Sequence, residues 1–221
     1  AMDKVLTKTI VNSQGVRVAG HIAVDRETWA VNSREVVDAV CKDIGLPCVV
    51  KPSRLGSSVG VEIPQSADAL PAAIEKVLDV ADHIMIEEFL SGRELTCAVL
   101  DAEPNGLIRP LPITEIRPKT SAFFDYTAKY TAGASEEITP APLDEFTAQN
   151  IQQIAADVHQ IVGCRGWSRS DFMLLEDGPV FIEVNTVPGL TETSLFPQAA
   201  AAYGIPYPKL MRLFVEAALR K

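Results

Sequence analysis

The sequence has few cysteines and histidines, and neither type is clustered. Its 221 residues include four cysteines and three histidines, all widely scattered and without a C-x-x-C pair. This pattern indicates reduced, buried thiols and gives no support to a disulfide framework or a Cys/His zinc site. No run approaches the ~18 apolar residues of a membrane span, and the first residues lack the apolar region of a signal peptide. We therefore expect a cytoplasmic protein.

An excess of positive charge is also lacking. The formal net charge is −9, which excludes a broad nucleic-acid footprint but allows a local basic pocket for one anionic ligand. The sequence also lacks repeats and low-complexity tracts. It has neither the G-x-x-x-x-G-K-[ST] P-loop nor the strand-to-helix dinucleotide fingerprint. With 47% apolar and 22% charged residues, the composition is that of a globular chain with a substantial core.

Apolar runs and turn signals predict helices and short strands that alternate along the chain. Strands are expected at residues 16–24, 47–53, 61–63, 83–90, 94–100, 107–116, 167–175 and 179–185, and the main helices at 2–13, 32–44, 144–162, 194–203 and 206–220. Asn32 and Asp68 are predicted to cap the helices that follow them. Most strands sit in hairpins, which indicates an α+β fold with antiparallel sheets in two lobes, residues 1–88 and 89–221.

The segment 117–142, "RPKTSAFFDYTAKYTAGASEEITPAP", differs from the rest of the chain. It is polar, aromatic and without a regular period. A loop of this length in a compact domain is usually functional or disordered, and its aromatic residues argue against disorder. We therefore expect a functional loop.

A second candidate feature is "FIEVNTVPG", residues 181–189, in which polar residues interrupt an apolar strand. Glu183 and Asn185 are two positions apart and so share one face of that strand. The Asp177-Gly178 turn would place Asp171 of "SRSDFMLL" on the neighbouring arm of a hairpin. Oxygen ligands of this kind suit Mg²⁺ or Mn²⁺, and Arg169 beside them suggests a bound anion such as phosphate. The alternative is a solvated sheet face with a surface ion pair.

The stretch "VVKPSRLGSSVGVEI", residues 49–63, joins two strands through a glycine-rich loop. Glycines let backbone N–H groups approach an anion closely, and Lys51 would add a point charge for a phosphate. The alternative is an ordinary hairpin turn with an edge lysine. The loop also matches G-x-S-x-G, the nucleophile elbow of hydrolases, but a strand rather than a helix follows it. Neither His83 nor His159 lies in a loop-like context, so a serine hydrolase is disfavoured.

The stretch "MIEEFLSGREL", residues 85–95, ends a strand with two acidic residues. A strand edge that leads into a connector offers backbone groups to an adenine edge, and Glu94 lies near enough to accept hydrogen bonds from ribose hydroxyls. The alternative for Glu87 and Glu88 is a solvated acidic strand end.

Taken together, these motifs resemble the C-terminal, ATP-grasp part of D-alanine–D-alanine ligases. The resemblance runs along essentially the whole chain and rests on "MDK", "VVKPSRLGSSVGV", "IEEFLSGRELT", "FFDYTAKYT", "GWSRSDFML" and "IEVNTVPGLTETSLFP". It implies an ATP-grasp fold, with the nucleotide held between two lobes. It also implies an ATP-dependent ligase for peptidoglycan precursors, in which the first D-alanine becomes an acyl phosphate and the amine of the second attacks it.

The resemblance further implies roles for individual residues. For ATP these are Lys4, Lys51 and Lys129 on the phosphates, Ser57 and Ser58 in the lid, Glu87 on the adenine amino group, the backbone of Glu88 and Leu90 beside it, and Glu94 on the ribose. For the metal and the reacting groups they are Asp171, Glu183 and Asn185 on two Mg²⁺ ions, Arg169 and the backbone of Gly189 on the intermediates, and Ser194 and Leu195 on the carboxylate of the second D-alanine. Tyr130 joins Ser57 in a hydrogen-bonded trio and accompanies D-alanine as the second substrate.

The sequence departs from the family in one respect. Family members carry an α/β domain before "MDK" that supplies much of the first D-alanine site, and this chain has none. We therefore expect the chain alone to bind ATP without ligating D-alanine. The alternatives are a stand-alone nucleotide-binding module and a ligase for another D-amino acid or D-lactate. A homodimer is compatible with the resemblance for a full-length enzyme.

Overall fold

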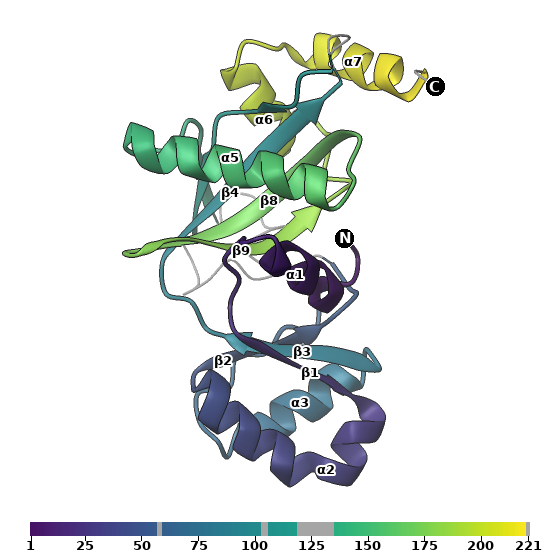
Figure 1. The fold of residues 1–221 in the computed structure, drawn as a ribbon, viewed down its shortest axis with the longest axis vertical. Coiled ribbons are helices and arrows are strands. Elements are labelled where there is room, and N and C mark those ends of the chain that lie inside the picture. Colours follow the sequence, from purple (N-terminus) through teal and green to yellow (C-terminus); the bar gives the residue numbers. More distant parts are fainter. Residues whose placement is uncertain (57–58, 103–105, 119–134, 220–221) are drawn as a thin grey trace.

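The computed structural model describes residues 1–56, 59–102, 106–118 and 135–219. These residues form two lobes, one above the other in Figure 1, and each lobe is built on a sheet. Every strand pair within the two sheets is antiparallel, as predicted. No helix in the described part of the chain is both long enough and apolar enough to cross a membrane.

The small lobe has a three-stranded sheet covered by helices on one face (Figure 1). Its elements are β1 (His21–Asp25), α2 (Arg26–Ala39), the π-helix η1 (Val40–Ile44), β2 (Cys48–Pro52), α3 (Leu70–Leu78) and β3 (His83–Glu88), and the strand order is β1-β3-β2. Ile84 and Ile86 of β3 are buried in the core with the helices. Since side chains alternate along a strand, Met85 and Glu87 point to the opposite face, toward the larger lobe.

Two predicted helix caps are wrong. Asn32 lies inside α2 in a non-helical conformation, with φ −125° and ψ 34°. The helix begins six residues earlier because Asp25, at the end of β1, accepts a hydrogen bond of 2.7 Å from the backbone N–H of Thr28. Asp68 does not cap α3 either, since the N-cap residue is Ala69 and makes no side-chain bond.

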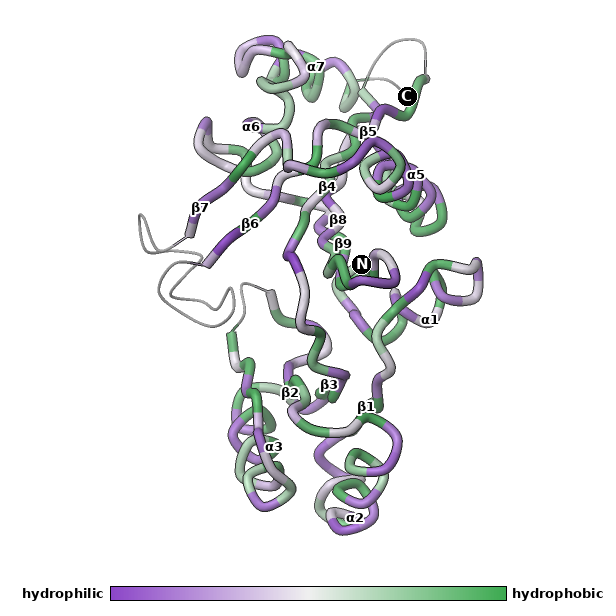
Figure 2. The backbone as a smooth tube through the Cα atoms, turned by 90° about the vertical axis from the view of Figure 1, so that its left-hand side faces the viewer, coloured by the Kyte–Doolittle hydropathy of each residue, from purple (hydrophilic) through white to green (hydrophobic). Residues whose placement is uncertain are grey.

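The larger lobe has a six-stranded sheet with helices on both faces. Its elements are β4 (Arg93–Asp101), β5 (Arg109–Pro110), β6 (Thr114–Pro118), β7 (Ser135–Ile138), α5 (Glu145–Ile161), β8 (Gly166–Leu175), β9 (Gly178–Asn185), α6 (Leu195–Ala202) and α7 (Tyr207–Leu219), with strand order β7-β6-β4-β8-β9 and β5 beside β4. Leu95 and Cys97 of β4 pack toward α5, and Ala98 and Leu100 pack toward α6 and α7. Figure 2 shows hydrophobic and hydrophilic segments alternating along these helices, as a helix with one buried face requires.

The helix α1 (Lys4–Ser13) lies between the lobes (Figure 1). Its Val11 is fully buried in the core of the larger lobe, beside α5 and β9. Its first backbone N–H, from Lys4, donates 2.8 Å to the carbonyl of Ser53 in the small lobe. The helix therefore contacts both lobes, while the division of the chain at residue 88 stays a prediction.

The connector between the lobes, residues 89–92, passes close to β8. A Cβ atom on Gly92 would lie 2.4 Å from the backbone oxygen of Leu174. Side chains cannot occupy that space, so glycine is required where the chain crosses from β3 to β4.

Phe172 of β8 anchors the core of the larger lobe, where it is fully buried and makes an edge-on contact with Phe181 at 6.0 Å between ring centroids. Phe172→Ala is expected to lower the free energy of unfolding by about 3–5 kcal/mol, because it opens a cavity in a packed core. The matched control is Phe146→Ala, whose side chain is 80% exposed and should change stability by less than about 0.5 kcal/mol. Urea unfolding measures both, and similar losses would contradict the described core.

Candidate active site

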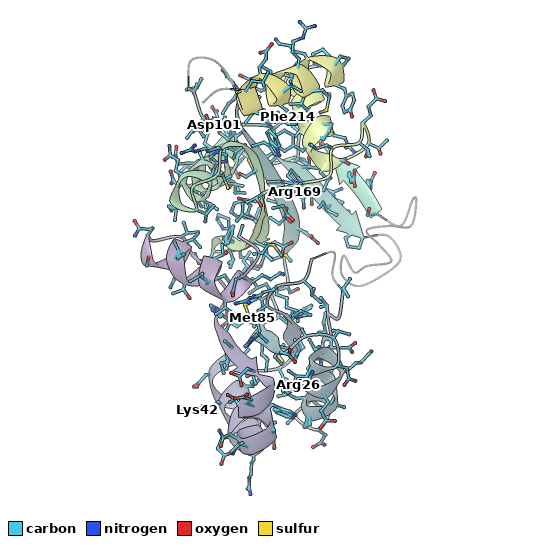
Figure 3. The ribbon with its side chains drawn as sticks, turned by 90° about the vertical axis from the view of Figure 1, so that its right-hand side faces the viewer. Arg26, Lys42, Met85, Asp101, Arg169 and Phe214 are labelled. Atoms are coloured by element: carbon cyan, nitrogen blue, oxygen red, sulfur yellow. The ribbon has the colours of Figure 1, made fainter. Side chains whose placement is uncertain are left out.

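A cleft of about 430 Å³ lies between the two sheets. Its size is within the range of small-molecule sites. It is lined by many of the predicted ATP and metal residues, namely Lys4, Lys51, Glu87, Glu88, Leu90, Glu94, Asp171 and Glu183. These residues come from α1, β2, β3, β4, β8, β9 and the connector. Folding therefore brings together residues that are as far apart in the sequence as positions 4 and 183. In Figure 3, Met85 lies at the side of the small lobe that faces the larger one, and Arg169 lies in the larger lobe.

A larger hollow of about 790 Å³ lies elsewhere, between the end of α1, α5 and the β8–β9 turn. None of the predicted site residues lines it, and Arg17 and Asp177 at its edge are paired with each other at 2.9 Å. The chemistry-bearing residues therefore single out the cleft rather than the larger hollow.

The buried carboxylate of Glu87 is held by two lysines. Its Oε2 accepts from Lys8 Nζ at 2.5 Å, and its Oε1 accepts from Lys51 Nζ. The side chain of Glu87 is only 5% exposed. Burial alone would raise the pKa of Glu87, but Lys51 and Lys8 outweigh burial and lower that pKa to about 2. Glu87 is therefore ionised, and its two oxygens act as acceptors.

The side of the cleft next to the glycine-rich loop contains Lys4. Its Nζ donates 2.5 Å to the carbonyl of Leu55, at the start of the glycine-rich loop, and lies 3.8 Å from Glu183 Oε2. Lys4 thus connects the loop of the small lobe to the acidic strand of the larger one. Ser57 and Ser58, further along that loop, lie outside the described residues, as do Lys129 and Tyr130.

The predicted acidic face on β8 and β9 is confirmed. Asp171 pairs with Glu183 and Arg169 with Asn185 in the antiparallel register, so all four side chains share one face. Asp171 accepts from Arg169 Nε at 2.9 Å, and from Asn185 Nδ2 at 2.9 Å. It also accepts from the Thr96 hydroxyl at 2.7 Å. Arg169 is a cation held directly against the predicted metal ligand.

The donor set fits a hard cation. Two carboxylates and an amide oxygen on one face are the ligand types that Mg²⁺ prefers. Among the described residues, no group of three or more His, Cys, Asp and Glu side chains could hold a metal, so Asn185 is needed to complete the set. Since Asp171 already accepts from Arg169, Thr96 and Asn185, a metal would take the place of some of these donors.

Other predicted residues lie away from the cleft lining. A Cβ on Gly189 would lie 2.8 Å from the Ser194 hydroxyl, so these two residues are neighbours in the loop before α6. Ser194 accepts from the backbone N–H of Thr191 at 3.2 Å. Leu195 begins α6. Glu88, in contrast, lines the cleft, and its Oε2 accepts from the Gly20 N–H at 2.9 Å.

Two charged groups at or behind the cleft were missed in the sequence. One is Lys8, which lies behind the lining and is four residues after Lys4, therefore on the same helix face. The other is Glu115, whose carboxylate is bound by Arg93 through two bonds of 2.9 and 2.8 Å and by Arg117 at 2.8 Å. Glu115 and Arg117 are two positions apart in a strand, the same signal that marked Glu183 and Asn185.

A Ser-His-Asp arrangement occurs elsewhere in the larger lobe. His159 Nδ1 lies 2.7 Å from the Ser168 hydroxyl, and His159 Nε2 lies 3.7 Å from Asp101, which Figure 3 labels. Ser168 and His159 are fully buried, and burial lowers the pKa of His159. No substrate can reach this serine, so the arrangement is structural and the described residues give no support to a hydrolase.

Comparison with known proteins places these features in a family. The profile described as the D-ala D-ala ligase C-terminus matches residues 10–216. The chain belongs to this family. It is 43% identical to a D-alanine–D-alanine ligase of Desulfotalea psychrophila over 224 aligned residues, covering 100% of the chain and 67% of that relative.

Solved structures agree with this assignment. A Bacillus anthracis D-alanine–D-alanine ligase complexed with ATP has a TM-score of 0.80 and 28% identity, over 99% of this chain and 66% of that one. The VanG D-Ala:D-Ser ligase of Enterococcus faecalis has a TM-score of 0.83 and 29% identity, over 99% and 62%. The chain thus spans about two thirds of the length of these relatives. The expected ATP-grasp fold and enzyme class, an ATP-dependent D-alanine ligase, are confirmed.

Arg93 links Glu115 of β6 to the chain that follows β7, since it also donates 3.0 Å to the carbonyl of Pro142. Glu115→Gln is expected to lower the free energy of unfolding by about 1.5–3 kcal/mol near neutral pH, because charge-assisted bonds are lost. Hydrogen bonds from Arg93 are the main cause that lowers the pKa of Glu115 from 4.5 to about 2. The wild-type advantage should therefore be complete above pH 4.5 and disappear as pH falls through about 2.

Urea unfolding at several pH values checks this expectation. The control is Glu75→Gln on the exposed side of α3, which should follow the wild type at every pH. A Glu115→Gln deficit that is the same at acidic and neutral pH would show that the charge of Glu115 does not contribute.

Proposed function

We propose that this chain supplies the ATP-binding and metal-binding centre of a ligase that joins two D-alanines through an acyl phosphate for peptidoglycan precursor synthesis. The observation that carries the proposal is the cleft, in which Lys4, Lys51 and Glu87 meet Glu94, Asp171 and Glu183 across the two lobes. The reaction consumes ATP, and we assign it to the cytoplasm for that reason.

The nucleotide is proposed to lie along the cleft, with its base in the small lobe. Glu87 accepts a hydrogen bond from the adenine amino group, and the backbone of Glu88 and Leu90 lies beside the ring. Glu94 accepts from the ribose hydroxyls. Lys51 and Lys4 bind the phosphates as point charges, which positions the terminal phosphate near Glu183.

Asp171, Glu183 and Asn185 are the residues that would hold Mg²⁺ or Mn²⁺, with two ions proposed. The metal, when bound, neutralises phosphate charge and orients an in-line displacement. Arg169, which bonds to Asp171, would then be released toward the oxygens of the transferred phosphate. This placement makes positioning and electrostatics the main sources of rate enhancement.

The bond changes follow from these positions. A carboxylate oxygen of the first D-alanine attacks the terminal phosphorus, and ADP leaves with the electrons of the broken P–O bond. The neutral amine of the second D-alanine then attacks the acyl carbon, loses a proton, and inorganic phosphate leaves. Arg169 and the backbone N–H of Gly189 stabilise the negative oxygens, and Ser194 and Leu195 bind the carboxylate of the second D-alanine. We propose that the segment 117–142, with Lys129, Tyr130 and Ser57, excludes water from the acyl phosphate.

Glu183 is proposed as a metal ligand, so its charge should be essential. In the full-length ligase, Glu183→Gln is expected to reduce D-alanine-dependent ATP turnover by about 100-fold or more at limiting Mg²⁺, because a hard dication loses a carboxylate. The matched control, Glu176→Gln in the exposed β8–β9 turn, should retain wild-type turnover. A coupled assay of ADP release across a Mg²⁺ series measures both, and normal turnover of Glu183→Gln at low Mg²⁺ would refute the metal assignment.

The second substrate needs its own test, because a D-Ala:D-Ser ligase has the same fold as this chain. We propose D-alanine, on the basis of Tyr130 in the family pattern. Competition between D-alanine, D-serine and D-lactate near neutral pH should give predominantly D-alanyl-D-alanine by mass spectrometry. A predominant D-alanyl-D-serine or D-alanyl-D-lactate product would contradict the assignment, and ATP binding without any D-alanine-dependent product would favour a nucleotide-binding module.

A further inference from the structure

Lys8 of α1 is a buried cation to which the proposed reaction gives no role. Its side chain is fully buried, and its Nζ lies 2.5 Å from Glu87 Oε2. Lys51 binds the other oxygen of the same carboxylate. A buried lysine is costly unless it is paired, so the Lys8–Glu87 contact accounts for its position but not for the presence of two lysines on one carboxylate.

The two lysines differ in their access to a ligand. Lys51 lines the cleft and its side chain is 11% exposed. Lys8 is 0% exposed and does not belong to the cleft lining. A nucleotide phosphate can therefore draw Lys51 away from Glu87 but cannot reach Lys8.

Moving Lys51 to a phosphate would leave Glu87 with Lys8 as its remaining cation among the described contacts. A buried carboxylate without a counter-ion takes up a proton rather than staying charged. Burial indeed acts to raise the pKa of Glu87, and the lysines act against it. Lys8 is placed to keep the carboxylate charged during that exchange.

We propose that Lys8 is a positioning residue for nucleobase selection, which remains on Oε2 of Glu87 while Lys51 moves to the phosphates, so that Glu87 meets the base as an ionised, acceptor-only group. The inference rests on the proposed function, in which Glu87 contacts the base. An ionised carboxylate accepts from the amino group of a 6-aminopurine, whereas the oxygen of a 6-oxopurine is an acceptor and is repelled. A protonated Glu87 could donate to that oxygen, and the selection would weaken.

The contacts that hold α1 in place support this role. Val11 fixes the helix to the core of the larger lobe, and Asp3 caps its first turn by accepting from the Leu6 N–H at 3.0 Å. Lys4 and Lys8 are one turn apart on the same face. Lys4 lies 3.8 Å from Glu183, in the larger lobe, and Lys8 binds Glu87 in the small one. One rigid helix thus presents a cation to each end of the cleft.

The test compares ATP with ITP, which carries oxygen in place of the 6-amino group. Lys8→Met keeps the apolar stem and removes the charge, Lys8→Arg keeps a cation, and Lys42→Met is a control at an exposed lysine of η1. We expect Lys8→Met to reduce the ratio of kcat/KM for ATP to that for ITP by about 10–100-fold, mainly through the KM for ATP. Lys8→Arg and Lys42→Met should preserve the wild-type ratio.

Two outcomes would overturn the inference. One is an equal loss of kcat/KM with ATP and with ITP in Lys8→Met, as a merely structural lysine would give. The other is wild-type kcat/KM with both nucleotides in that variant. If Lys8→Met does not fold, the double variant Lys8→Met with Glu87→Gln removes both buried charges. It should show the same weakened base selection as Glu87→Gln alone, and retained selection would refute the role of Glu87 and Lys8 together.

Calorimetry separates this inference from the proposed function. Binding of non-hydrolysable ATP and ITP analogues to wild type and Lys8→Met reports base selection without ligation. Absence of D-alanine-dependent turnover in the wild-type full-length ligase would refute the proposed function. The role of Lys8 would still be supported if the preference for the ATP analogue over the ITP analogue is smaller in Lys8→Met than in the wild type. An unchanged preference would refute that role.

Discussion

The ion group Lys8–Glu87–Lys51 is the constraint on which the arrangement of the two lobes depends. Glu87 and Lys51 belong to the small sheet, whereas Lys8 belongs to a helix whose Val11 is packed in the core of the larger lobe. Losing one partner while the other stays buried would leave an unpaired charge, which is far more costly than losing a surface ion pair. The ion group and the packing of Val11 therefore tie α1 to both lobes.

Several cations lie in or beside the cleft, in a chain whose formal net charge is −9. Lys4, Lys51 and Arg169 are held by Leu55, Glu87 and Asp171 respectively. Each cation is thus ordered by a protein acceptor that a phosphate or a metal-bound phosphate can replace. Ordering the side chains in advance reduces the entropy lost when the nucleotide binds.

The alternation of side chains along a strand and the sequence signal of the hairpin turn made the shared face of Asp171, Glu183 and Asn185 predictable. Glu183 and Asn185 share a face because they are two residues apart, and Asp177-Gly178 fixed the turn that brought Asp171 opposite Glu183. The same rule applies to Glu115 and Arg117, but their partner Arg93 comes from a different strand, so their clustering was not evident. The caps show the limit of local signals. Asn32 has the composition of a cap, yet Asp25 begins the helix, because β1 ends there and burial of Trp29 and Val36 sets the helix face.

The sequence by itself determined the α+β class, the alternation of buried and exposed faces, the β8–β9 hairpin and the family motifs, because each depends on residues close together in the chain. The tertiary structure alone decided that Lys8 meets Glu87, 79 residues away, that α1 packs with the larger lobe, and that Arg93 binds Glu115. Contacts of this kind depend on how whole elements pack. A buried charge can be recognised as paired or unpaired only when the element opposite it is in place.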